Sequence, residues 1–249
     1  MSKRTLRYPL ACAACLLSCT LNAQTLVTLE GGMVDSSKND VAIPGNSGTR
    51  FDLDEAADAD PAAYVRLELE KRWGDDLRHS VRLVYAPLRI ESDGQLDAAT
   101  DFNGDSFAAG PVETTYQFDA HRITYRYRVY ATDTSRLQLG VTGLVRDAEI
   151  RLQQDATDSS KSNVGFVPLL HLKGDLILTR NWNLALEIDG LAAPQGRAFD
   201  ISLRGEYAFT ERVSGYLGYR LLDGGADNDE VYNFARFHFA AAGLRFDFQ

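Results

Sequence analysis

The sequence predicts an all-β fold, an up-and-down antiparallel β-barrel of about ten strands, with eight or twelve strands as alternatives. Three observations indicate this fold. Apolar and polar residues alternate with a period of two over segments of about ten to nineteen residues, as in strands with two different faces. The segments are even in number, and long polar connections alternate with tight turns between them. No stretch after residue 23 has the pattern of a convincing helix.

The alternation is clearest in YVRLELEKRW (64–73), where Val65 and Leu67 share one face and Arg66 and Glu68 share the other. The predicted strands are 25–34, 61–73, 78–90, 112–130, 135–153, 161–178, 182–193, 197–209, 212–224 and 231–248. The tight turns are GDDL (74–77), ATDTS (131–135), TRN (179–181) and the bend at Glu211.

Two of these segments change parity part-way along. Tyr116 and Phe118 occupy even positions, whereas the apolar residues from Ile123 onwards occupy odd ones, and the following segment shows the same change. One inserted residue in each strand would bring all of the apolar side chains onto one face. We therefore expect a β-bulge near Ala120–His121 and another near Arg146–Asp147.

The long connections are acidic. They include 35–60 and 91–111, and we expect both to be solvated loops. Asp101, Asn103 and Asp105 have the opening spacing of a calcium-binding loop, but serine follows them where that loop needs glycine. The sequence therefore predicts no EF-hand, and weak surface binding of divalent cations is the alternative. No metal site and no other cofactor are expected.

Residues 1–23 have the pattern of a secretory signal peptide: a basic start, a short apolar stretch and Ala23 before Gln24. All three cysteines lie in this segment, so the mature chain contains no disulfide framework and no thiolate zinc site. An alternative is cleavage before Cys19, which would leave a lipidated N-terminus. We expect residues 24–249 to form a single domain. With a formal net charge of −9 on the whole chain, nucleic acid is not expected as a partner.

Alternation alone does not show which face meets water, because a soluble β-sandwich also alternates. The apolar faces carry aromatic residues near strand ends, as membrane-interface girdles do. These aromatic residues are Trp73, Tyr130, Trp182, Phe209, Phe246 and Phe248. They favour a transmembrane barrel whose apolar face meets lipid, over an exported β-sandwich.

The chain ends in AAAGLRFDFQ (240–249), in which Leu244, Phe246 and Phe248 alternate with charged residues. Together with the predicted signal peptide, this final strand resembles that of Gram-negative outer-membrane β-barrel proteins, although Gln249 follows the last aromatic residue. The resemblance covers the architecture of the whole mature chain. It implies location in the outer membrane, contact with outer-membrane lipids and recognition of the last strand by the barrel-assembly machinery. We expect a monomer.

The polar face of the predicted wall carries both signs of charge. It includes Arg66, Glu68, Glu70, Arg72, Arg82, Arg126, Arg128, Glu187, Asp189, Arg204, Glu206 and Arg220. Burying charges without partners is costly, so these side chains should pair across a narrow lumen. We expect a salt-bridge network that largely plugs the barrel, and the alternative is a polar pore or ligand site.

Histidine and carboxylate residues suggest an enzymatic alternative. His171 lies on a strand beside the one that carries Glu187 and Asp189, so it could form a base with an orienting carboxylate. His238 is a second candidate near the rim. Omptin-type proteases and lipid A deacylases are barrel enzymes, but the chain has no motif of either. We therefore expect a non-enzymatic outer-membrane barrel with a structural or binding role, or with passage of small solutes. A surface hydrolase acting on lipid or peptide and an exported β-sandwich binding module are the alternatives.

Overall fold

The structure is a computed structural model that describes residues 23–57 and 60–248. The predicted signal peptide lies outside the described residues except for its last residue, Ala23. The wall is built from β1 (Ala23–Ala42), β3 (Ala62–Trp73), β4 (His79–Ala86), β5 (Arg89–Leu96), β8 (Gly110–Ala131), β9 (Ser135–Gln154), β10 (Thr157–Ile177), β11 (Trp182–Ala193), β12 (Gly196–Ala208), β13 (Val213–Asp227) and β14 (Tyr232–Phe248). The smaller elements are β2 (Phe51–Asp52), α1 (Leu53–Ala57), a 3₁₀ turn (Asp75–Leu77), β6 (Thr100–Phe102) and β7 (Asp105–Phe107).

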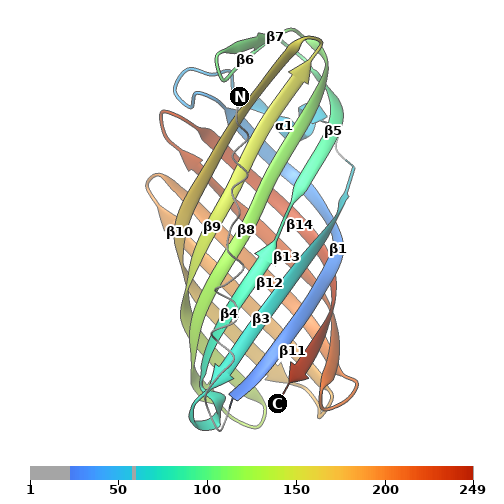
Figure 1. Cartoon of the computed structure of the whole chain (residues 1–249), viewed down its shortest axis with the longest axis vertical. Helices are drawn as coiled ribbons and strands as arrows, with labels where there is room; N and C mark the ends of the chain where they lie inside the picture. The colour runs from blue at the N-terminus through green and yellow to red at the C-terminus, as the bar shows by residue number, and fades with distance from the viewer. Residues whose placement is uncertain (1–22, 58–59, 249) are drawn as a thin grey trace, which may run out of the picture.

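The wall is a closed antiparallel barrel with ten strand positions (Figure 1). Strands β4 and β5 pair with successive parts of β8 and so share one position. The last strand pairs with the first, which closes the barrel and leaves no free edge along most of the wall. The predicted fold class and strand number are confirmed. Among the described residues, no helix is long and apolar enough to span a membrane.

The strands are strongly staggered. Following the paired residues once around the wall from Asp35 leads back to Ala23 on the same strand. Such a stagger requires strands that tilt against the barrel axis. Strand β1 begins and β14 ends at the bottom of Figure 1, among the tight turns. We call this the short-turn end and the opposite end the long-loop end.

The outer wall carries a wide belt of exposed apolar side chains. Leu217 is 73% exposed and Val65 is 63% exposed. The belt also includes Leu29, Met33, Leu67, Ile123, Val129, Val141, Leu170, Leu186, Leu203 and Leu244. At the same level of the wall, the inward side chains are buried charges such as Arg82 and Glu187. This distribution is the inverse of a soluble sandwich, and it is the one expected where the surroundings are lipid.

Towards the long-loop end the polarity of the interior changes. Along β8 the buried inward residues run from Tyr116 through Arg122 and Thr124 to Arg126, all at even positions. Tyr116 belongs to an apolar core inside the barrel, whereas Arg126 belongs to the charged interior below it. The even-numbered side chains of β8 from Tyr116 to Arg126 therefore point into the barrel, while the interior around them changes from apolar to charged.

This change shows that the two predicted β-bulges are wrong. The register of β8 with β9 runs unbroken through Ala120–His121 and Arg146–Asp147, and it shifts only between Arg128 and Tyr130. The change of parity in the sequence marks a change of environment along a continuous strand. Apolar side chains face outward at the level of the belt and inward above it.

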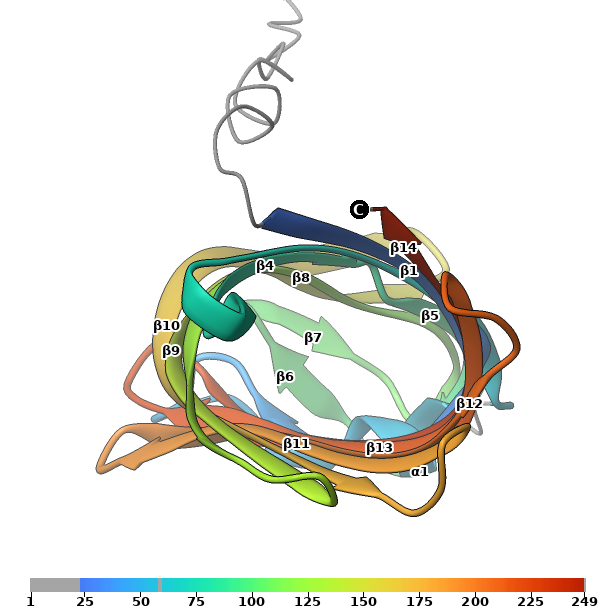
Figure 2. The ribbon, with the colours of Figure 1, turned by 90° about the horizontal axis from the view of Figure 1, so that it is seen from below.

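Segments predicted to be solvated loops contribute part of the apolar core at the long-loop end. Phe102 and Phe107, from the hairpin β6–β7, are almost completely buried, as is Leu53 of α1. Figure 2 shows the hairpin and α1 within the outline of the barrel, at the end far from the viewer. Asn103 and Gly104 both have positive φ, of 52° and 91°, which is the backbone of a tight hairpin turn. The prediction of solvated loops for 35–60 and 91–111 was wrong because their short apolar runs fold inward.

Candidate functional site

The predicted lumen charges lie inside the barrel at the level of the apolar belt, with one exception. Arg82 and Arg126 are each 1% exposed, and their buried neighbours are Arg66, Glu68, Glu70, Glu187, Asp189, Arg204, Glu206 and Arg220. Arg72 is partly buried and donates to Glu70. The exception is Arg128, which donates to the Asp76 carbonyl in the first tight turn.

These side chains form ion pairs, some along one strand or between nearby strands and others across the lumen. The Arg82 guanidinium on β4 donates to the Glu187 carboxylate on β11. The other oxygen of Glu187 accepts from Arg204 at 2.9 Å. Further pairs join Arg126 to Glu70 at 2.5 Å, Arg66 to Glu68 at 2.9 Å and Arg245 to Glu206 at 3.0 Å. Multiple partners for each charge offset the cost of removing it from water.

Arg122, Asp200 and Glu30 are among the further members of the network that lie outside the predicted set. Arg122 contacts both Asp189 and Asp200, and Asp200 accepts two hydrogen bonds from Arg220, each of 2.8 Å. Glu30 accepts from the Tyr64 hydroxyl at 3.0 Å and from the Tyr216 hydroxyl at 2.6 Å. Strand parity is the signal that identifies them, because each shares the parity of a predicted lumen residue on its own strand or of the buried residues around it.

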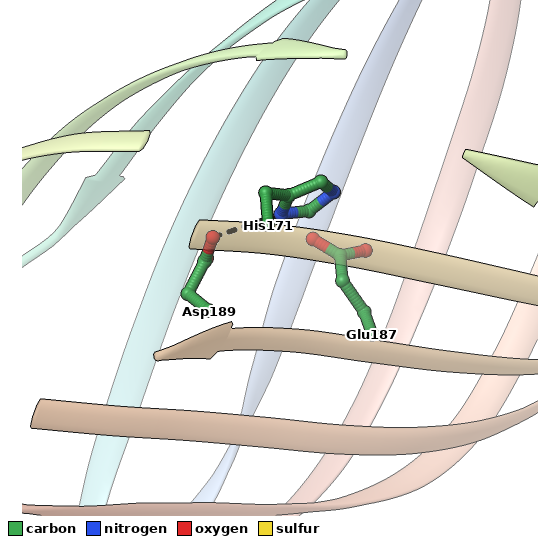
Figure 3. Close-up of side chains that lie close together, drawn as sticks. All are labelled: His171, Glu187 and Asp189. Carbon is green, nitrogen blue, oxygen red and sulfur yellow. Dashed lines mark hydrogen bonds and ion pairs between the residues drawn. The ribbon is translucent and has the colours of Figure 1, made fainter. Parts of the chain in front are cut away.

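His171, Glu187 and Asp189 form a compact cluster within this network (Figure 3). His171 Nδ1 lies 2.8 Å from Asp189 Oδ1, so the structure brings together the predicted base and orienting carboxylate. The same carboxylate oxygen accepts from the Thr142 hydroxyl at 2.6 Å. All three members of the cluster are at least 95% buried.

The cluster has the residue types of a metal site. Ligand atoms of its three residues lie within 4.8 Å of one another. However, Arg82 and Arg204 already occupy the Glu187 carboxylate, and Arg122 lies 3.4 Å from Asp189 Oδ2. A divalent cation would have to enter among several guanidinium groups. The arrangement therefore suits a structural network better than a metal centre.

A lateral cavity lies above the charge network, where the wall is incomplete. Strand β10 pairs with β11 only over Leu170–Ile177, so residues 157–169 have a partner strand on one side only. The β11–β12 hairpin ends well below the tops of β9 and β10 (Figure 1). The cavity behind this gap has a volume of about 430 Å³.

The lining of the lateral cavity is amphipathic. Its apolar residues include Leu144, Leu169, Ala198, Leu222, Val231 and Phe237. Arg122 and Asp200 of the charge network lie at its base, and Arg146, Lys161 and Asn163 lie on the β9–β10 side. Arg146 donates to Asn163 at 3.1 Å, and Phe166 beside the gap is 68% exposed on the outer wall. Sequence alternation gave no sign of this cavity, because it depends on the unequal heights of neighbouring strands.

No protein-family model matches the chain, and no curated protein matches it. Solved structures do share the fold. The outer membrane protease OmpT from Escherichia coli is 10% identical, with a TM-score of 0.51 over 92% of this chain and 99% of that chain. An outer membrane channel from Pseudomonas putida F1 is 10% identical, with a TM-score of 0.43 over 90% of this chain and 94% of that chain. The attachment invasion locus protein Ail of Yersinia pestis is 9% identical, with a TM-score of 0.42 over 89% of this chain and 99% of that chain.

At 10% identity the likeness to OmpT shows the fold and not the activity. The fold agrees with what the chain itself presents: a closed antiparallel barrel, an exposed apolar belt and a charged interior. Barrels are the form in which β-strands cross a membrane, because closure satisfies every backbone group. The chain therefore has the architecture of an integral membrane β-barrel, the fold that the outer membrane protease also has.

Proposed function

We propose that this barrel is closed to solutes along its axis and binds an amphipathic, lipid-like molecule in the lateral cavity. The lateral cavity, an amphipathic space reached through a gap in the wall, supports this binding role. Its volume lies within the range of small-molecule sites.

Two layers of side chains support axial closure. Arg82, Arg126 and their partners fill the interior at the level of the belt. Phe102 and Phe107 cover the interior at the long-loop end. Passage of ions or solutes would require both layers to open. This arrangement supports a binding role over conduction.

The shape and chemistry of the lateral cavity support a ligand with one acyl chain. Leu144, Leu169 and Leu222 offer apolar contact inside, and Arg146 and Lys161 offer positive charge for a polar end. The gap faces sideways, above Leu170 of the apolar belt, so a lipid in the adjoining leaflet could enter without leaving the membrane.

Titration of the purified barrel in nanodiscs with a dansyl-labelled undecanoic acid tests whether the lateral cavity binds a ligand with one acyl chain. Ala198 points into the lateral cavity, and Ala198→Trp should weaken binding at least tenfold by filling it. Ala192 is exposed on the neighbouring strand, so Ala192→Trp is the matched control and should bind as the wild type does. Equal affinity in the two variants would exclude the cavity as the site. A steady single-channel current through the wild type in planar bilayers would contradict the closed lumen.

A further inference from the structure

Ser37 and His238 form a hydrogen-bonded pair on the outer wall, away from both the charge network and the lateral cavity. Ser37 Oγ lies 2.8 Å from His238 Nε2, although the residues are 201 positions apart in the sequence. His238 Nδ1 lies 2.5 Å from the Tyr219 hydroxyl. We propose that Ser37 is a nucleophile and His238 its general base, for cleavage of a carboxylic ester in a lipid of the surrounding membrane.

A β-bulge directs Ser37 outward. The register of β1 with β14 shifts after Ser36, which makes Ser37 the extra residue. The Ser36 hydroxyl donates to Asp54 Oδ2 of α1 at 2.7 Å, whereas Ser37 is exposed. On the other side of the bulge, the Asn39 N–H donates to Asp52 Oδ1 at 3.2 Å. Two carboxylates thus hold the chain on both sides of Ser37, and bulges of this kind re-aim side chains next to active sites.

The neighbours of His238 suit a general base. When the Nδ1 hydrogen is donated to the Tyr219 oxygen, Nε2 is left as the acceptor for the Ser37 proton. Asp35 stands directly opposite His238 in the β1–β14 register, where side chains of paired residues are roughly 5 Å apart at Cβ. Its negative charge would stabilise the imidazolium that forms when His238 accepts a proton.

The pair lies where the outer wall changes from apolar to charged. On the short-turn side, Met33 is 48% exposed and Tyr219 is 49% exposed. On the long-loop side, Lys38 and Arg236 project with their acidic partners. In a leaflet, ester groups lie between the acyl chains and the headgroups, so this level presents Ser37 to them.

The step balances with water as the only co-reactant. Ser37 Oγ attacks the ester carbonyl carbon while its proton passes to His238 Nε2. The bond from that carbon to the lipid alcohol breaks, and the alcohol oxygen takes the proton from His238. A water molecule then gives a proton to His238 and attacks the acyl-serine. The fatty acid leaves, and Ser37 recovers its proton.

Two measurements on the full-length folded barrel test the proposal. A fluorophosphonate probe should label Ser37, located by peptide mass spectrometry. Mixed micelles containing phosphatidylglycerol or lipopolysaccharide should release free fatty acid. Ser37→Ala should abolish both signals, and His238→Gln should slow labelling about 100-fold or more, as expected for loss of a general base. Tyr219→Phe, a change in a positioning residue, should shift the pH profile of labelling.

The chain supplies its own controls. Ser36→Ala changes the adjacent serine, which faces α1, and should leave labelling at Ser37 unchanged. His79 bonds to Tyr125 at 2.9 Å at the short-turn end without a serine in the pair, so His79→Gln should also have no effect. Heat-modifiable migration in gels confirms that each variant is folded. The proposal is overturned if the folded wild type is not labelled at Ser37, if His238→Gln is labelled at the wild-type rate, or if neither lipid releases fatty acid.

Discussion

Arg82 and Glu187 lie 105 residues apart in the sequence and hydrogen-bond across the lumen, from β4 to β11. Three strands separate them along the wall, so this contact exists only when the barrel is closed. It joins opposite sides of the interior at the level of the apolar belt, and the stability of the closed barrel should depend on it.

Replacing Arg82 by alanine should therefore destabilise the barrel strongly. Glu187 and Asp189 would keep their charges in a buried site with one guanidinium fewer, and breaking a buried pair in this way costs about 3–5 kcal/mol. Urea unfolding in lipid vesicles measures the loss. The exposed pair of Arg151 with Asp158 is the control, and Arg151→Ala should leave the unfolding midpoint close to that of the wild type. Equal effects of the two substitutions would show that the cross-lumen pairs contribute little.

Removing the hairpin β6–β7 should not open a channel. Leu96 and Gly110 are already paired neighbours, so an Asn–Gly turn can replace residues 97–109 between them. The shortened barrel should be less stable, because the burial of Phe102 and Phe107 is lost. It should still show no steady current in planar bilayers, since the ion pairs below fill the lumen. A steady current would mean that the hairpin alone closes the barrel.

Helix α1 should be better protected in mild acid than at neutral pH. Burial raises the pKa of Asp54 to about 6, and the nearby charges of Asp52 and Asp35 act in the same direction, while the Ser36 hydroxyl opposes them. The raised pKa means that the folded state holds the proton more tightly than the unfolded state. The stabilising contribution is thus complete below about pH 4 and is lost as the pH rises through about 6.

Hydrogen exchange of the α1 amides, corrected for intrinsic rates, measures this effect. Asp54→Asn should keep a partner for Ser36 and remove the pH dependence between pH 4 and 7. If the protection of the wild-type helix rose with pH across that interval, the assigned direction would be wrong.

The last strand gives a prediction about assembly. Phe248 pairs with Thr25 at the closing seam and is 57% exposed on the outer wall. Phe248→Ala should slow assembly in cells more than deletion of Gln249 does, because the aromatic residue carries the pattern of the final strand. The fraction of folded, heat-modifiable protein in outer-membrane preparations measures both. If neither change lowered this fraction, the role predicted for the last strand in recognition by the assembly machinery would be wrong.

The sequence predicted the strands well wherever one side of the wall meets lipid. Val65, Leu67 and their alternating charges required a two-faced strand, and the structure contains it. The sequence does not distinguish a change in the direction of the apolar side chains from a change in their surroundings, so the parity of Tyr116 predicts a bulge that the structure does not contain. A period of two shows only that successive side chains differ in polarity. Whether each face of the strand meets lipid or the barrel interior is decided by the assembled barrel.

The candidate sites differ in how far the sequence alone could predict them. His171 and Asp189 could be paired in advance because their strands are consecutive. Ser37 could not be linked to His238, since their contact depends on barrel closure and on one extra residue in β1. The lateral cavity could not be predicted from the sequence either, because it depends on the unequal heights of the strands around β11 and β12.

The reversal of interior polarity has a consequence for biogenesis. The apolar core around Phe102, Phe237 and Leu152 lies at the long-loop end, opposite the described chain ends, so it can form only after those segments have passed the level of the apolar belt. The favourable free energy of burying this apolar surface is therefore gained at the long-loop end and not at the short-turn end. Once the core has formed, the long connections could move back through the barrel only if the core unfolded. Formation of the core therefore favours translocation of these segments in one direction, without hydrolysis of a nucleotide.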